Sequence, residues 1–230
     1  MTKRAKRRRA DRSQRVVGKI NQQPWKQLEY KHQPMEILGQ ADIEQIHQAG
    51  LTILQDIGIT VMAPEAQEAY EAAGFILNKK TGRARFDPAL VESLIAKAPD
   101  SFILHARNPA KNLTIGGNKA VFVSTGGPAY CMDNDKGRHN GTYEEACDFL
   151  RLVQSLDILH MEGGGGFEAM DLPDKTRHLD LFYSQATLLD KNWQPWAVGH
   201  EQAMDAINFA AIMMNKQPEE LAYTPVFSCV

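Results

Sequence analysis

The second half of the chain alternates between short apolar segments typical of strands and amphipathic segments with helical spacing. The predicted strands begin near residues 120, 158, 196 and 224. A strand and a helix therefore recur roughly every 30 to 38 residues, which is the period of a parallel α/β structure. Two architectures share this period, the doubly wound sheet and the (β/α)8 TIM barrel.

Local signals support the elements within this repeat. The segment Thr142-Tyr-Glu-Glu145 is a capping box, in which the threonine and the glutamate satisfy each other's backbone N–H groups, and we expect it to begin the first helix. The first strand is a continuous apolar run, so we expect it to be buried on both faces. The other helices are predicted over 174–189 and 201–214, and the strands over 120–125, 158–162, 196–200 and 223–230.

Four consecutive glycines, Gly163 to Gly166, follow the second predicted strand and decide between the two architectures. A dinucleotide-binding sheet requires Gly-x-Gly-x-x-Gly at the start of a helix directly after a strand. The run lacks that spacing, and a stretch that includes Pro173 separates it from the next helix. The barrel is therefore favoured, and a nucleotide-binding α/β protein is the least favoured alternative.

A barrel carries its chemistry on the loops that follow its strands. These loops would contain Ser124 to Tyr130, the glycine run, His200 and the pair Ser228-Cys229. Four strands out of the eight that a barrel needs leave an open edge and an unfilled interior. Residues 118–230 are thus predicted to be the first half of a barrel, which is either a fragment or depends on a partner for closure.

Residues 31–117 are predicted to form an α+β accessory region before the barrel. Asp87-Pro88 combines a good N-cap with proline at the first helical position, so a helix begins there. A hairpin is expected over 75–86, where two apolar ends flank an Asn-Lys-Lys-Thr-Gly turn. Further helices are expected over 43–58 and 64–73, and strands over 59–62, 101–107 and 112–116.

The N-terminus is strongly basic. Residues 1–19 carry nine Lys or Arg against Asp11 alone, a local charge of +8 that leaves −10 on the remainder of a chain whose net charge is −2. We expect residues 1–30 to be a solvated, disordered tail that can attract an acidic partner or anionic lipid nonspecifically. No aromatic side chain interleaves the arginines, so nucleic-acid binding is not favoured.

Membrane insertion and a metal site are not expected from the sequence. No run approaches the roughly 18 apolar residues of a membrane span, and no apolar segment follows the basic start as in a secretory signal, so a cytoplasmic location is predicted. Cys131, Cys147 and Cys229 contain no Cys-x-x-Cys pair, which favours buried thiols over disulfides or a zinc site. Cys131 and His139 flank a polar turn, but their spacing fits no familiar metal-ligand set.

Five segments carry a family resemblance when they are taken in order. They are Arg107-Asn-Pro-Ala-Lys-Asn-Leu-Thr-Ile-Gly-Gly-Asn118, the Val121-Phe122 strand, Gly141-Thr142, the Gly163 to Gly166 loop and Arg177-His-Leu-Asp180. Together they resemble the trimethylamine methyltransferase family, which includes glycine betaine and other quaternary amine methyltransferases that lack pyrrolysine. The resemblance runs from about Gln40 to Val230, roughly the N-terminal half of a family protein, and departs from the family at Lys119, where His is commoner.

The resemblance implies a (β/α)8 barrel that moves a methyl group from trimethylamine or a betaine to the Co(I) of a separate corrinoid protein. The implied cofactor is thus a corrinoid (cobalamin) held by that partner protein, with no metal bound directly by this chain, and homo-oligomerisation stays open. Because Co(I) is itself a strong nucleophile, the barrel's task is to orient the N-methyl group, and no acid or base is obligatory. The alternative is a noncatalytic barrel fragment that acts as a binding or assembly module.

The implied substrate points to particular side chains. A quaternary ammonium makes no conventional hydrogen bond, so aromatic faces and a carboxylate should hold it. Tyr130, Phe167 and Trp196 are the aromatic candidates, Glu162 and Glu168 are the candidate counter-charges, and His200 is a candidate donor to a substrate carboxylate. Gly163, Gly164, Gly165 and Gly166 either let the corrinoid approach the substrate or simply turn tightly above a strand. Arg177 and His178 are expected to be structural, with Arg177 either packing or ion pairing.

Overall fold

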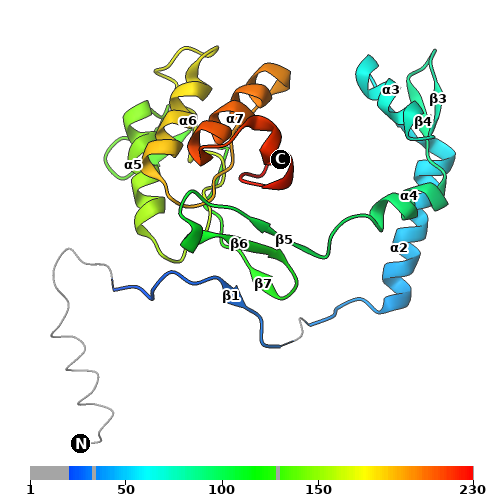
Figure 1. The fold of residues 1–230 in the computed structure, drawn as a ribbon, viewed down its shortest axis with the longest axis horizontal. Helices are drawn as coiled ribbons and strands as arrows, with labels where there is room; N and C mark the ends of the chain where they lie inside the picture. The colour runs from blue at the N-terminus through cyan, green and yellow to red at the C-terminus, as the bar shows by residue number, and fades with distance from the viewer. Residues whose placement is uncertain (1–20, 33–34, 128–129, 230) are drawn as a thin grey trace, which may run out of the picture. The chain divides into compact units, whose positions relative to one another are not determined.

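The computed structural model describes residues 21–32, 35–127 and 130–229, so most of the predicted basic tail lies outside the described residues. The described residues form two compact units. One unit comprises residues 31–32 and 35–100. The other comprises the described residues of 21–30 and 101–229. Figure 1 shows the helices and strands of each. The domain boundary after residue 117 stays a prediction, but the structure groups 101–117 with the C-terminal segments.

The unit within residues 31–100 has the predicted elements. The antiparallel sheet has the order β2-β4-β3 and packs Val61, Ala84 and Phe86 into a small core with neighbouring aromatic rings. Asp87 accepts a hydrogen bond from the Leu90 N–H, which confirms the predicted helix start. Its elements are α2 (Gln40–Thr52) with a π-helical turn (Ile53–Ile57), β2 (Ile59–Thr60), α3 (Pro64–Ala72), β3 (Ile76–Asn78), β4 (Arg83–Arg85) and α4 (Pro88–Ile95).

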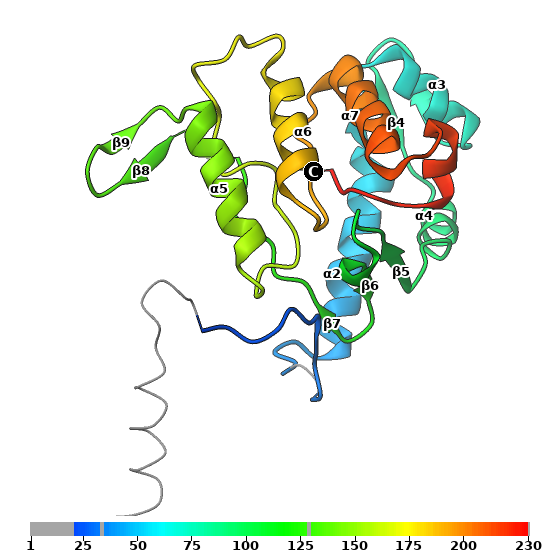
Figure 2. The same ribbon diagram turned by 60° about the vertical axis from the view of Figure 1, so that its left-hand side comes forward.

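The other unit contains three small antiparallel pairs. β5 (Ser101–Leu104) pairs with β6 (Leu113–Gly116), as predicted. β1 (Leu28–Glu29) pairs with β7 (Lys119–Ala120), so residues 21–30 pack on this unit although the sequence assigns them to the tail. β8 (Cys131–Asp133) and β9 (Gly137–His139) form a hairpin that the sequence did not predict and that extends away from the following helix (Figure 2).

Four further segments of this unit run parallel to one another in chain order. Single parallel bridges join Val123 to Met161, Met161 to Asn192, and Trp193 to Phe227. The bridges agree with the parallel order that the sequence predicts, but none of these described segments forms a regular strand. The first is also less buried than expected, because the Phe122 and Val123 side chains are 43% and 45% exposed.

The third predicted strand, 196–200, is wrong. The parallel segment lies at Asn192 and Trp193, and a helix already begins at Gly199. The physical reason is that Lys191 and Asn192 are buried polar residues, 1% and 0% exposed, so the true segment does not look apolar.

Three consecutive helices lie side by side (Figures 1 and 2). They are α5 (Tyr143–Ser155), α6 (Arg177–Leu188) and α7 (Gly199–Met214), and a 3-10 helix (Pro218–Tyr223) follows. The predicted capping box is present, since Thr142 accepts from the Glu145 N–H and Glu145 from the Thr142 N–H. The core joins the helices to the segments through Leu150, Val153, Phe182, Leu189, Trp193, Ala206, Ala210 and Val226. Within the described ranges, no helix combines the length and the apolar character that crossing a membrane requires.

Candidate functional site

The loops that follow the four parallel segments line one open hollow of about 350 Å³. Every loop contributes: Gly126 and Gly127 follow the first segment, Gly163 and Gly164 the second, residues 194–198 the third and Cys229 the fourth. Strand-end loops of parallel segments meet on one side because the segments run in one direction. The hollow is therefore the candidate functional site, and it lies after the parallel segments, where the sequence predicts the site.

Hydrogen bonds tie these loops together at their bases. The Gly127 N–H donates to the carbonyl oxygen of Gly165 over 3.1 Å, and the Gly163 N–H donates to the Ser124 Oγ over 3.0 Å. The Glu162 N–H donates to the carbonyl oxygen of Asn192 over 3.0 Å. The first, second and third loops thus form one hydrogen-bonded rim.

Two glycines of the run are packed too closely for side chains, and the other two have backbone angles that favour glycine. A Cβ added to Gly163 would lie 2.2 Å from the carbonyl oxygen of Ser124, and one added to Gly166 would lie 2.7 Å from the Phe149 ring. Gly164 and Gly165 have φ angles of 97° and 87°, in the left-handed region that favours glycine. These contacts account for the run as a tight turn, and its predicted role toward a corrinoid stays a prediction.

Glu162 lies beneath this turn and is fully buried. One carboxylate oxygen accepts the Gly165 N–H, and the other accepts the Gln185 Nε2 over 2.8 Å. Burial raises the pKa of Glu162 above its ordinary value, while the backbone N–H groups of Gly164 and Gly165 act in the opposite direction. The carboxylate therefore does not reach the hollow, and it can influence a ligand there only through its charge.

Trp196 is the predicted aromatic residue that reaches the hollow. Its indole is half-buried, and Gly127 stands opposite, where an added Cβ would lie 3.7 Å from the ring. Because Gly127 has no side chain, that part of the ring stays uncovered. Trp196 also lines a neighbouring hollow with Glu168, Arg177 and His178.

The remaining predicted residues do not line the hollow. Tyr130 is exposed and stacks with the Arg138 guanidinium, whose carbon lies 3.9 Å from the ring centre. Phe167 is buried beside Phe149, with 6.4 Å between ring centres. His200 is exposed in the first turn of α7, so its predicted position at a strand end is wrong.

The charged residues around α6 pair with one another instead. Glu168 accepts from the Arg177 guanidinium over 2.8 Å, and Arg177 also pairs with Asp174. The His178 Nε2 lies 2.9 Å from an Asp205 oxygen. The structural role expected for Arg177 fits these pairs, which neutralise Glu168 as a counter-charge.

Sequence reasoning missed three polar residues around the hollow. Gln194 lines it and lies 3.4 Å from the Ser228 hydroxyl, and Gln185 holds Glu162 from α6. The buried Asn192 amide has no hydrogen-bond partner among the described residues. Single buried amides leave no periodic signal, so only their tertiary neighbours reveal them.

Comparison with known proteins agrees with the resemblance found in the sequence. Residues 4–230 match the trimethylamine methyltransferase (MTTB) family. A glycine betaine methyltransferase of Desulfitobacterium hafniense (strain Y51) is 34% identical over 177 residues, which are 77% of this chain and 36% of that protein. A proline betaine:corrinoid methyltransferase of Eubacterium limosum is 21% identical over 182 residues, 79% of this chain and 36% of the relative.

A trimethylamine methyltransferase MttB of Desulfitobacterium hafniense (strain DSM 10664 / DCB-2) is 26% identical over 113 residues, 49% of this chain and 23% of the relative. The matched residues span about a third of the length of the glycine betaine and proline betaine relatives, so the chain corresponds to only part of such a protein.

Proposed function

The chain belongs to the trimethylamine methyltransferase family, and we propose that it contributes the first half of a (β/α)8 barrel whose mouth binds a methylated amine for methyl transfer to a corrinoid protein. The observation that carries the proposal is the convergence of all four strand-end loops on one hollow beside Trp196. Barrel enzymes place substrates at this end of the strands. A betaine is the favoured substrate class.

Trp196 is the residue that we assign to the substrate's ammonium group. A quaternary ammonium over an indole face gains about 0.5–2 kcal/mol, more when water is excluded. Gly127 leaves room for methyl groups beside the ring, because it carries no side chain there. The buried Glu162 adds a negative charge beneath the turn when it is ionised.

The carboxylate of a betaine has its own complement in the hollow. Val198 lines the hollow and directly precedes α7, whose N-terminal end carries a partial positive charge. The Gln194 side-chain amide is a second donor near that wall. We therefore place the substrate carboxylate toward residues 194–198 and the ammonium toward the Trp196 ring.

The corrinoid of a partner protein would supply the nucleophile that accepts the methyl group, and the amine would leave with the electron pair of its C–N bond. This chain's residues then have to hold one N-methyl group toward the open side of the hollow. That side is lined by glycines, which have no side chains to block the approach of the broad corrinoid ring. They are Gly126, Gly127, Gly163 and Gly164. No proton has to move when the leaving group is a neutral tertiary amine.

Calorimetry with glycine betaine tests the ammonium site. We expect the betaine to bind and 3,3-dimethylbutanoate, in which a neutral tert-butyl group replaces the trimethylammonium group, to bind at least about tenfold more weakly, since tenfold is 1.4 kcal/mol. Trp196→Ala should remove this difference, whereas Tyr183→Ala, a change of an exposed ring on α6, should keep it. Equal binding of both ligands by the unchanged protein would overturn the assignment.

Methyl transfer itself needs a separate measurement. We expect the protein, mixed with a reduced corrinoid protein and a betaine, to convert the Co(I) absorption spectrum to that of methyl-cobalt. Trp196→Ala should slow this conversion, and Tyr183→Ala should not. Betaine binding without any conversion would support the noncatalytic binding module instead.

A further inference from the structure

The β8–β9 hairpin and the first turn of α5 bring together three different metal-binding side chains. The Sγ of Cys131, a ring nitrogen of His139 and a carboxylate oxygen of Glu145 all lie within 4.8 Å of one another. Cys131 and His139 face each other across the hairpin, and Glu145 comes from the helix that follows. This cluster lies outside the residues that line the proposed substrate site.

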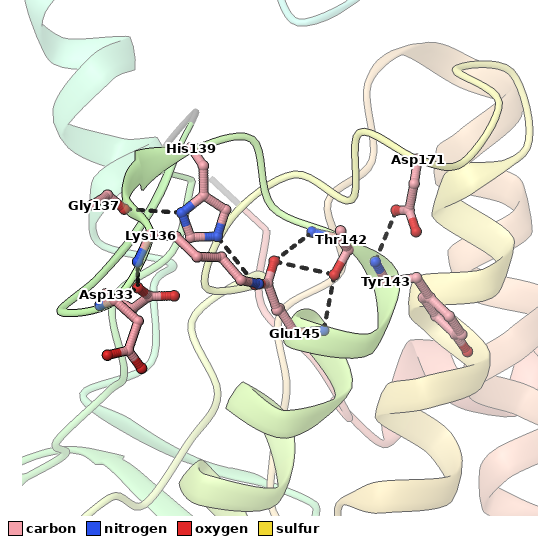
Figure 3. A network of polar contacts seen from close by, with 9 residues as sticks. Asp133, Lys136, Gly137, His139, Thr142, Tyr143, Glu145 and Asp171 are labelled. Carbon is pink, nitrogen blue, oxygen red and sulfur yellow. Dashed lines mark hydrogen bonds and ion pairs between the residues drawn. The ribbon is translucent and has the colours of Figure 1, made fainter.

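His139 is already oriented as a ligand. Its Nδ1 lies 2.9 Å from the carbonyl oxygen of Gly137, so Nδ1 carries a hydrogen and donates (Figure 3). The other nitrogen, Nε2, lies 3.0 Å from the Glu145 Oε1. In the neutral ring, Nε2 presents a lone pair to a carboxylate oxygen, and two acceptors at this distance need a proton or a metal cation between them. Metal-bound histidines typically donate their second nitrogen to a backbone carbonyl in this way.

Glu145 is held in the same manner. Its Oε2 accepts from the Thr142 N–H over 3.0 Å and from the Thr142 hydroxyl over 3.1 Å. The capping box therefore fixes the carboxylate and leaves Oε1 to face His139 and the Lys136 ammonium, which is 2.6 Å away (Figure 3). The Lys136 side chain is 60% exposed, so it can turn into solvent when another cation occupies its place.

We propose that Cys131, His139 and Glu145 bind one divalent transition-metal ion, with Zn²⁺ the best fit, and so fasten the β8–β9 hairpin to the start of α5. Sulfur, imidazole nitrogen and carboxylate oxygen are the three ligand types that Zn²⁺ accepts, and water can take the fourth tetrahedral position. Binding releases the Cys131 thiol proton and any proton on His139 Nε2. The sequence spacing gave no such expectation, because the third ligand comes from the helix.

Cobalt substitution reports the ligands directly. We expect the purified protein to bind one Co²⁺ and show a thiolate-to-cobalt charge-transfer band in the near ultraviolet, which one equivalent of Zn²⁺ abolishes. Cys131→Ser should remove the band, while Cys229→Ser, a change of an exposed cysteine elsewhere, should keep it. No band in the unchanged protein, or a band that survives Cys131→Ser, would overturn the proposal.

Two further variants separate metal binding from folding. Glu145→Gln retains a capping-box side chain, so it should keep the helix and its circular dichroism but weaken Zn²⁺ by more than about tenfold. Lys136→Met removes the competing ammonium and should tighten Zn²⁺ binding, a gain that mere loss of structure does not produce. Unchanged Zn²⁺ affinity in both variants, measured by competition with a chromophoric chelator, would contradict the proposed ligand set.

Discussion

Gly126 and Gly163 meet backbone to backbone at the candidate site: a Cβ on Gly126 would lie 1.7 Å from the carbonyl oxygen of Gly163. The contact joins the loop after the first parallel segment to the loop after the second. No side chain fits between them, so the rim of the hollow depends on both residues being glycine.

Gly126→Ala should destabilise the protein. The added methyl group must displace the Gly163 backbone, which costs about 1–3 kcal/mol as overpacking does elsewhere. Gly50→Ala is the matched control, because an added Cβ meets nothing within 4 Å there and the residue lies in α2. That control should stabilise by about 0.5–1 kcal/mol. Urea unfolding of both variants measures the difference, and equal stabilities would contradict the close contact.

Glu162→Gln should flatten the dependence of stability on pH. Because burial raises the pKa of Glu162 in the folded protein, the folded state holds this proton more tightly than the unfolded state. The resulting stability is present below the unfolded pKa, ordinarily 4.5, and is lost as pH rises through the higher folded pKa. Glutamine does not ionise, so Glu162→Gln should not lose stability in this way as the pH rises.

The substitution should be tolerated, because Gln185 can turn its unpartnered Oε1 toward the new amide. Urea unfolding across acidic pH checks the slope for both proteins. A slope that is the same in the variant would show that Glu162 is not responsible.

Lys191→Met should destabilise the protein at neutral pH. The Lys191 ammonium donates to the carbonyl oxygens of Val153 and Leu156 over 2.7 and 2.8 Å at the end of α5. Without it these buried acceptors lose their partner, at a cost of about 1–3 kcal/mol. Thermal unfolding of the variant at pH 7 tests this loss.

The same lysine also predicts a rise of stability in alkali. Burial lowers the pKa of Lys191 from 10.5 to about 8, so between these values the unfolded state binds more protons. Its contribution to the free energy of unfolding therefore increases from about pH 8 toward pH 10.5. Lys191→Met should lack this increase, and an identical alkaline profile in both proteins would argue against the shift.

Arg107→Lys should weaken the protein although it keeps the charge. The guanidinium donates to the carbonyl oxygens of Ala186 and Leu189 at the end of α6, and one ammonium does not reproduce that planar fork. We expect a loss of about 1 kcal/mol in chemical unfolding. Arg151→Lys, on an exposed ion pair of α5, should change stability little. A larger loss of stability in Arg151→Lys than in Arg107→Lys would contradict the role given to the Arg107 guanidinium.

Local elements followed closely from the sequence. The capping box at Thr142 and Glu145, the N-cap at Asp87 and the hairpin over 75–86 all appear where they are predicted. Such signals act between residues only a few positions apart, so they survive whatever the rest of the chain does. The predicted position of the third parallel segment was wrong because the segment contains the buried polar residues Lys191 and Asn192. An apolar pattern in the sequence does not reveal buried polar residues.

The candidate site was predicted only in part. The rule that chemistry follows parallel strands led to the Gly163–Gly166 turn and Trp196, which do line or border the hollow. The same rule also selected Tyr130, Phe167 and His200, which do not line the hollow. Residue type and position in the sequence do not show where a side chain points.

The sequence by itself determined the family, the helices with their caps and the parallel alternation of segments, because these depend on patterns within short stretches. Only the tertiary structure decided that the glycine turn packs on Gly126, that Glu162 lies buried beneath it, and that Glu145 meets Cys131 and His139. Those arrangements depend on contacts between segments that are distant in the chain. Side-chain burial and backbone hydrogen bonding in the folded protein select them.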